Sequence, residues 1–159
     1  MLYYSLIMDI LKTLKKKAVQ ELVVSKQYLR DTKGNMQTIA IYLFGSFAKG
    51  TERGKSDIDL AFVFNDKFYK EDPFRSLQKA ELFSIAITRK LHKSVDVIIL
   101  NSASLSFAYH ALRKGVCLYE SNTVDRILYE VAMHNKYQDF MPFIKELRDS
   151  KREKLLGRN

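Results

Sequence analysis

The chain has 159 residues, 47% of them hydrophobic, with 27 Lys and Arg against 18 Asp and Glu, a net charge of +9. This length predicts a single domain, residues 1–159, with a core of its own. No apolar stretch reaches membrane-spanning length, and the lone Cys117 excludes an internal disulfide, so a cytoplasmic protein without membrane contact is expected. The excess positive charge attracts anions: nucleotides, nucleic acids or an acidic protein surface.

The first predicted elements are a helix and two strands. The helix spans residues 6–30. The run TIAIYLF, Thr38–Phe44, is rich in β-branched and aromatic residues, which predicts a strand. A second strand is expected over Asp57–Phe64, and Gly50 and Gly54 let the chain turn back between the two strands.

Further along the chain, helices and short strands alternate. Asp72 before Pro73 is typical of a helix start and predicts a helix to about Leu91. Ser94–Leu100 (SVDVIIL) predicts a third strand. The next helix begins at Ser102 or Ser104, one of which serves as its N-cap.

The same pattern continues to the C-terminus. Gly115 is expected to end the preceding helix in a left-handed conformation. A short strand follows over Val116–Tyr119. Asn122 or Thr123 then caps a helix to about Met141. Pro142 predicts a kink or a restart there, so C-terminal helices are expected over 122–156.

The most informative motif is Gly45-Ser46, followed after ten residues by Asp57-Ile58-Asp59. Residues i and i+2 of a strand share a face, so Asp57 and Asp59 point together into a cleft, while Ile58 points into the core. Adjacent carboxylates repel, and a hard divalent cation relieves that repulsion. A bare Asp-x-Asp is also typical of a turn or cap, but the upstream Gly-Ser favours a metal site.

The Gly-Ser pair and a third acid fit this interpretation. Without a Cβ, Gly45 lets the backbone approach a ligand closely, and Ser46 offers a hydroxyl to phosphate oxygens. A short helix starting here would aim its amides at the same anion. Asp96 is an isolated acid in an apolar strand, so it completes a three-carboxylate cluster if this strand lies beside Asp57. The alternative is an edge-strand charge that blocks aggregation.

These residues carry a resemblance to a known family. LFGSFAKG, SDIDLAFVF and VDVIIL match the pattern G-S-x(7–13)-D-x-[DE] with a later acid, and the match runs from about Ile39 to the end. The chain resembles the DNA polymerase β-like nucleotidyltransferases. More closely, it resembles the minimal nucleotidyltransferases (MNT), antitoxins to HEPN-domain toxins. The resemblance implies an α+β fold: a small mixed sheet of about four strands flanked by helices, with its catalytic core over 38–120.

The resemblance also implies an activity: transfer of AMP from ATP to a tyrosine hydroxyl of a cognate HEPN RNase toxin, in a hetero-oligomer. Asp57, Asp59 and Asp96 would bind two Mg²⁺ ions, or Mn²⁺ as an alternative, and Asp96 would help to deprotonate the hydroxyl. The nucleotide would be bound by five further residues: Gly45, Ser46, Ser56, Lys49 and Arg53. For any one of the cations, surface solvation is the simpler role.

Other functions stay open from the sequence. The chain leaves little room for a substrate domain, so the acceptor surface must come from a partner, a second copy or the acceptor itself. One alternative is a non-enzymatic antitoxin that acts by binding alone. Another is a small-molecule nucleotidyltransferase of the aminoglycoside type, which would want an acidic pocket that this basic chain does not suggest. Nucleic-acid binding or terminal transfer is permitted by the charge but not favoured, because no base-stacking module is recognisable.

Overall fold

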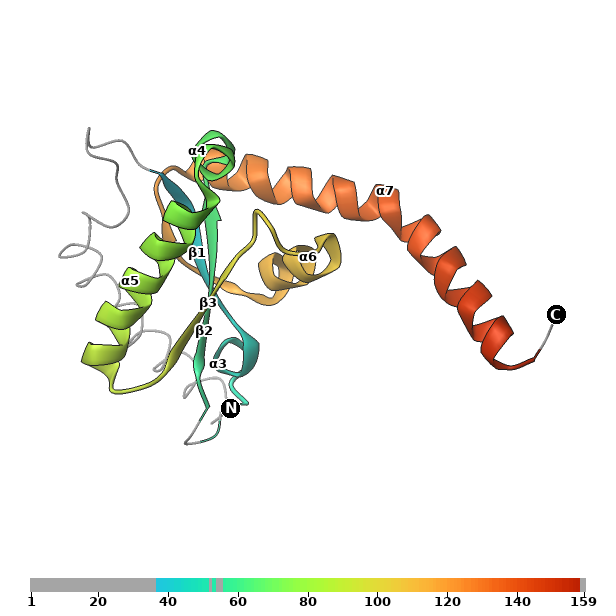
Figure 1. Cartoon of the computed structure of the whole chain (residues 1–159), viewed down its shortest axis with the longest axis horizontal. Helices are drawn as coiled ribbons and strands as arrows, with labels where there is room; N and C mark the ends of the chain where they lie inside the picture. Colours follow the sequence, from blue (N-terminus) through green and yellow to red (C-terminus); the bar gives the residue numbers. More distant parts are fainter. Residues whose placement is uncertain (1–36, 52, 54–55, 158–159) are drawn as a thin grey trace.

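The computed structural model describes residues 37–51, 53 and 56–157. It shows one sheet with helices on both faces, and the long C-terminal helix extends away from the body of the molecule (Figure 1). The predicted helix over 6–30 lies outside the described residues.

The sheet has four strands in the order β3-β2-β1-β4. β1 (Thr38–Phe44) is antiparallel to β2 (Ile58–Phe64) and to β4 (Val116–Glu120), whereas β3 (Val95–Ile99) is parallel to β2. The parallel pair requires a crossover, which the helices between β2 and β3 supply. The predicted α+β fold with a small mixed sheet is therefore confirmed.

The described residues also form helices between and after these strands: α3 (Gly45–Lys49), α4 (Asp66–Glu71), α5 (Pro73–Leu91), α6 (Leu105–Lys114) and α7 (Thr123–Leu155). Their starts follow the predicted caps. Asp72 accepts the Arg75 N–H at 2.9 Å, with Pro73 in the first turn of α5. Ser104, rather than Ser102, caps α6, and Asn122 caps α7. None of these described helices is long and apolar enough to cross a bilayer.

One prediction about a helix end is confirmed in part, and one is wrong. α7 does not stop or restart near Met141: it is one helix of 33 residues with Pro142 inside it, so of the two predicted effects of Pro142 the kink is the one that fits. Proline removes one hydrogen bond and bends a helix without ending it, and Figure 1 shows α7 bending partway along its length. Gly115 does follow α6, but its backbone is extended (φ −80°). A Cβ at Gly115 would press on the carbonyl oxygens of Ala111 and Leu43, so close packing requires the glycine.

The sheet separates two clusters of buried side chains. One face packs against α5, with Phe62, Phe64 and Phe83 at its centre. The other face packs against α6 and α7. Ile58 and Leu60 of β2 are both only 2% exposed and belong to the α5 cluster. Strand alternation therefore directs the acids that flank them towards the α6 and α7 side.

Candidate functional site

The predicted motif lies at one end of the sheet, where β1 turns into α3. Phe44, the last residue of β1, pairs with Asp59 of β2. Gly45 follows with φ +70°, and a Cβ built on it would lie 2.9 Å from the carboxyl carbon of Asp59. Both the backbone angle and the space therefore require glycine. α3 ends at Gly50, also left-handed (φ +66°), as expected for a turn.

The carboxylates come from two adjacent strands. Asp59 and Asp96 are directly paired in the parallel register of β2 and β3, which confirms that the third predicted strand lies beside the second. Asp57 is exposed and immediately precedes β2, which begins at Ile58, one residue later than predicted. The crossover thus brings Asp96 beside an acid 37 positions earlier in the chain.

The electrostatics of this end are unfavourable without a counter-charge. Burial raises the pKa of Asp59 above its ordinary value, and the negative charges of Asp96 and Asp57 raise it further. A bound cation would remove this penalty. The chemistry of the donor set fits Mg²⁺, which takes one or two protein carboxylates and completes its shell with water and substrate phosphate.

The described residues contain no group of three His, Cys, Asp or Glu side chains drawn closely enough together to form a ready-made metal cage. The negative charges of Asp96 and Asp57 both raise the pKa of Asp59, so both carboxylates act on it electrostatically.

The other predicted residues surround this end. Ser46 is half-buried in α3, next to Gly45, and Lys49 is exposed in the last turn of the same helix. Arg53 is exposed in the loop that follows. The Ser56 hydroxyl accepts the Arg53 N–H at 2.7 Å, and the Ser56 N–H donates to the Arg53 carbonyl at 2.8 Å. Ser56 thus closes the turn that leads into Asp57, a structural contribution that the sequence did not indicate.

One cation at this end escaped sequence reasoning. The Nζ of Lys93 lies 5.5 Å from the centre of the Phe47 ring, which is buried in α3. Lys93 stands just before Ser94, whose carbonyl accepts the Ile58 N–H at the start of β2. In the sequence, the signal that could have identified Lys93 is its position as a basic residue just ahead of the strand that carries Asp96.

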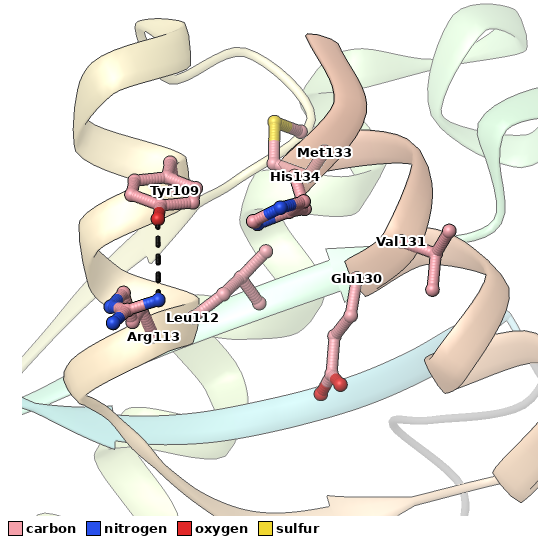
Figure 2. Close-up of a pocket in the computed structure, with 7 residues that line it drawn as sticks. All are labelled: Tyr109, Leu112, Arg113, Glu130, Val131, Met133 and His134. Carbon is pink, nitrogen blue, oxygen red and sulfur yellow. Dashed lines mark hydrogen bonds between the residues drawn. The ribbon is translucent and has the colours of Figure 1, made fainter. Parts of the chain in front are cut away.

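A pocket of about 270 Å³ lies elsewhere, between α6 and α7 (Figure 2). Its lining consists of seven residues: Tyr109, Leu112, Arg113, Glu130, Val131, Met133 and His134. None of them is a predicted site residue. The Arg113 guanidinium donates to the Tyr109 hydroxyl at 3.4 Å. This pocket is therefore a second feature, distinct from the acids.

The mixed sheet, with a glycine turn at one end and acids on the adjoining strands, is the architecture of a nucleotidyltransferase domain. The family model described as polymerase beta, nucleotidyltransferase, matches residues 26–124. The protein adenylyltransferase MntA of Shewanella oneidensis is 31% identical over 110 residues, covering 69% of this chain and 72% of MntA. The chain therefore belongs to the polymerase β nucleotidyltransferase family, among the minimal nucleotidyltransferases related to MntA.

Solved structures agree on the fold. A toxin–antitoxin structure with AMP-PNP is similar with a TM-score of 0.60 and 22% identity, covering 84% of this chain and 95% of that one. A tri-AMPylated HEPN toxin of Shewanella oneidensis in complex with its MNT antitoxin gives a TM-score of 0.56 at 19% identity, covering 86% and 97%. At these identities the likeness concerns the fold.

Proposed function

We propose that this chain transfers AMP from ATP to a tyrosine hydroxyl of a HEPN-family toxin and thereby acts as its antitoxin. The observation that carries the proposal is the pairing of Asp59 with Asp96 on adjacent strands, beside a glycine that approaches the Asp59 carboxylate closely. Carboxylates in this arrangement can hold divalent cations against a triphosphate. In the reaction, the acceptor oxygen bonds to the α-phosphorus of ATP, and pyrophosphate leaves.

The residues then have separate roles. Asp57, Asp59 and Asp96 would hold Mg²⁺, which when bound would stabilise charge on the attacking and leaving oxygens. Asp96 also orients the acceptor hydroxyl and accepts its proton. Gly45 and Ser46 bind the β- and γ-phosphates. Lys49, Arg53 and Ser56 lie near enough in the chain to contribute to the nucleotide site, and Lys93 is a further candidate cation at this end.

The acceptor is inferred from the relatives. MntA is a protein adenylyltransferase, and a similar structure holds a tri-AMPylated HEPN toxin with its antitoxin. Another similar structure contains AMP-PNP, an ATP analogue, which supports ATP as the donor. The cytoplasmic location expected from the sequence remains a prediction alongside this function.

The decisive experiment is intact-mass spectrometry of the HEPN toxin after incubation with this chain, ATP and Mg²⁺. We expect the toxin to gain the mass of one or more AMP groups, and peptide mapping to place them on tyrosine. Asp96→Asn should bind the toxin normally but leave its mass unchanged, because the hydroxyl is no longer activated. Neutralisation of the toxin without any mass change, retained in Asp96→Asn, would instead establish an antitoxin that acts by binding alone.

A further inference from the structure

The outer part of α7 is a surface that the fold itself does not use. Tyr137 is the last residue of α7 for which the described part of the structure shows contact with another element: its ring stacks on Tyr109 with centroids 3.9 Å apart. Beyond it, residues 140–155, here called the arm, extend away from the sheet (Figure 1). Phe140 and Leu147 on the arm are 53% and 56% exposed.

These apolar residues continue the face by which α7 packs on the body. Met133 belongs to the cluster under α6 and α7, and Tyr137 stacks on α6. Phe140, Ile144 and Leu147 then follow at alternating intervals of three and four residues. This spacing is the heptad repeat by which one helix packs along another. The face of α7 that packs on α6 therefore continues beyond the end of α6.

Charge on the arm is divided between two faces. On the arm, Glu146, Asp149 and Glu153 recur at intervals of three and four, and Asp139, just before the arm, stands seven residues ahead of Glu146, which places all four on one side of the helix. Counting from Ile144, the exposed bases Arg148 and Lys151 stand four and seven residues further on, which places them on the apolar face instead. The apolar face is therefore edged by positive charge, and the acids lie on the opposite side.

We propose that this apolar, base-edged face of the arm, together with the pocket between α6 and α7, docks the acceptor protein through a helical surface edged by acidic residues. The proposal rests on the proposed function, in which the acceptor is a protein. A second copy of this chain is a poor occupant, because it would bring the same bases against themselves. RNA would be drawn to the bases but gains little from the exposed Phe140 and Leu147 and the half-buried Ile144 between them.

The pocket strengthens the proposal, because it lies on the same helix pair at the inner end of this face. Its lining includes Met133, which begins the heptad spacing, and the exposed Arg113 and His134. Figure 2 shows Tyr109 and Leu112 of α6 and His134 of α7 turned toward the space between the two helices. About 270 Å³ is enough for one large side chain of a partner to insert as an anchor.

The position of the arm also suits the reaction. α6 and α7 cover the face of the sheet opposite to α5, and strand alternation directs Asp59 towards this same face. A protein held along α7 is therefore held on the side of the sheet to which the acids point. Docking here would bring the acceptor hydroxyl to the correct face before it reaches the nucleotide.

The test compares two leucines of α7 that are similarly exposed but stand on different faces: Leu147 on the arm, 56% exposed, and Leu128 nearer the start of the helix, 62% exposed. The dissociation constant for the HEPN toxin is measured by calorimetry with the full-length chain. We expect Leu147→Glu to weaken binding by about tenfold or more, and Leu128→Glu to change it by less than about twofold. Leu147→Glu should raise KM for the toxin but leave kcat at saturating toxin unchanged.

Two charge-reversal variants of the arm provide a second test of the docking surface. Arg148→Glu on the base-edged side should weaken toxin binding, and the weakening should shrink at high salt, whereas Glu146→Lys on the acidic side should not weaken it. Circular dichroism checks that each variant is folded. If Leu147→Glu fails to fold, Phe140→Ser provides the same measurement with a smaller change.

The outcomes separate the docking surface from the chemistry. Unchanged toxin binding by both Leu147→Glu and Arg148→Glu would refute the docking surface while leaving AMP transfer intact. Binding that follows the expected pattern with no AMP transfer by the wild type would refute the proposed function and keep the docking surface. A wild-type dimer that Leu147→Glu converts to a monomer, or an RNA oligonucleotide that competes with the toxin for the arm, would overturn the assignment of the occupant.

Discussion

The two faces of the sheet are built on different principles. On the α5 face, Phe62 packs against Phe64 and Phe83 with ring centroids 5.9 and 5.5 Å apart, and all three side chains are at most 2% exposed. On the α6 and α7 face, the buried Tyr42 hydroxyl donates to Glu130 at 2.5 Å. Arg126 of α7 binds the same Glu130 at 2.7 Å.

The difference indicates that one face of the sheet supplies most of the apolar packing, whereas the proposed chemistry lies on the other face. The α5 face is almost purely apolar, so its contribution comes from burial and close packing. The other face carries the acids at one end, the Tyr42 network in the middle and the arm beyond. The like charges of Asp59 and Asp96 oppose folding there, a cost that the apolar face must offset. Substitutions on the two faces should therefore have different signatures.

The largest effect should come from the apolar face. Phe62→Ala removes a fully buried ring and leaves a cavity, so the free energy of unfolding should fall by about 3–5 kcal/mol. Urea denaturation measures this loss. The folded fraction should still transfer AMP at close to the wild-type rate, because Phe62 points away from the acids. A kcat that fell with little loss of stability would contradict the division between faces.

The acids should show the opposite signature. Asp57→Ala with Asp59→Ala should lower the rate of labelled-AMP transfer by roughly a hundred- to a thousandfold while the fold survives. EDTA should abolish transfer by the wild type, and added Mg²⁺ should restore it. Because Asp59→Asn relieves repulsion by Asp96 and Asp57, its melting temperature without metal should equal or slightly exceed that of the wild type. Full AMP transfer by a folded Asp57→Ala, Asp59→Ala double mutant would contradict the proposed mechanism.

The glycine turn provides a graded comparison within the site. Gly45→Val should cost nearly as much activity as losing Asp59, because the new Cβ collides with that carboxylate and φ is +70°. Ser46→Ala removes one hydroxyl and should cost at most about 1–3 kcal/mol in transition-state stabilisation. Steady-state kcat/KM for ATP ranks the two variants. The reverse order would show that a side chain at position 45 does not disturb the Asp59 carboxylate.

The smallest effect concerns the polar network and pH. Burial, followed by the hydrogen bond to Glu130, raises the pKa of Tyr42 above its ordinary value of 10. The folded state therefore keeps this proton when the unfolded chain loses it, so stability is unaffected below pH 10 and falls as the pH rises further. Tyr42→Phe should cost about 1 kcal/mol at pH 8 and flatten the alkaline decline. Urea midpoints at pH 8 and at pH 10.5 test this, and an unchanged slope would contradict it.

Much of this fold was predictable because its signals are local. The apolar runs of β1 and β3, the Asp72-Pro73 start of α5 and the Asn122 cap of α7 each depend on residues within one turn or strand. The short α4 was missed, although Asn65 caps it by accepting the N–H groups of Lys67 and Phe68. A six-residue helix with no buried residue leaves no periodic apolar pattern to detect.

The remaining gaps concern relations between distant segments. That Asp57 and Asp59 share a face follows from strand periodicity, but the pairing of Asp96 with Asp59 depends on where β3 packs. The need for glycine at position 115 arises only partly from a distant segment: the carbonyl oxygen of Ala111 in α6 is the closer neighbour, and that of Leu43 in β1 is the second. Local chemistry at Pro142 predicted a kink or a restart without deciding between them. Helix formers on both sides of it outweigh the one lost hydrogen bond, so the helix continues.

The parallel pairing of β2 with β3 also determines when, during folding, the acids of the candidate site come together. Its two central acids are separated by a crossover that contains α4 and α5, so they meet only after a long loop has closed. Non-local parallel contacts form late and slowly compared with hairpins such as β1–β2. A newly synthesised chain therefore has no active site until β3 has paired with β2. The rate at which activity returns during refolding would measure the rate of this last pairing step.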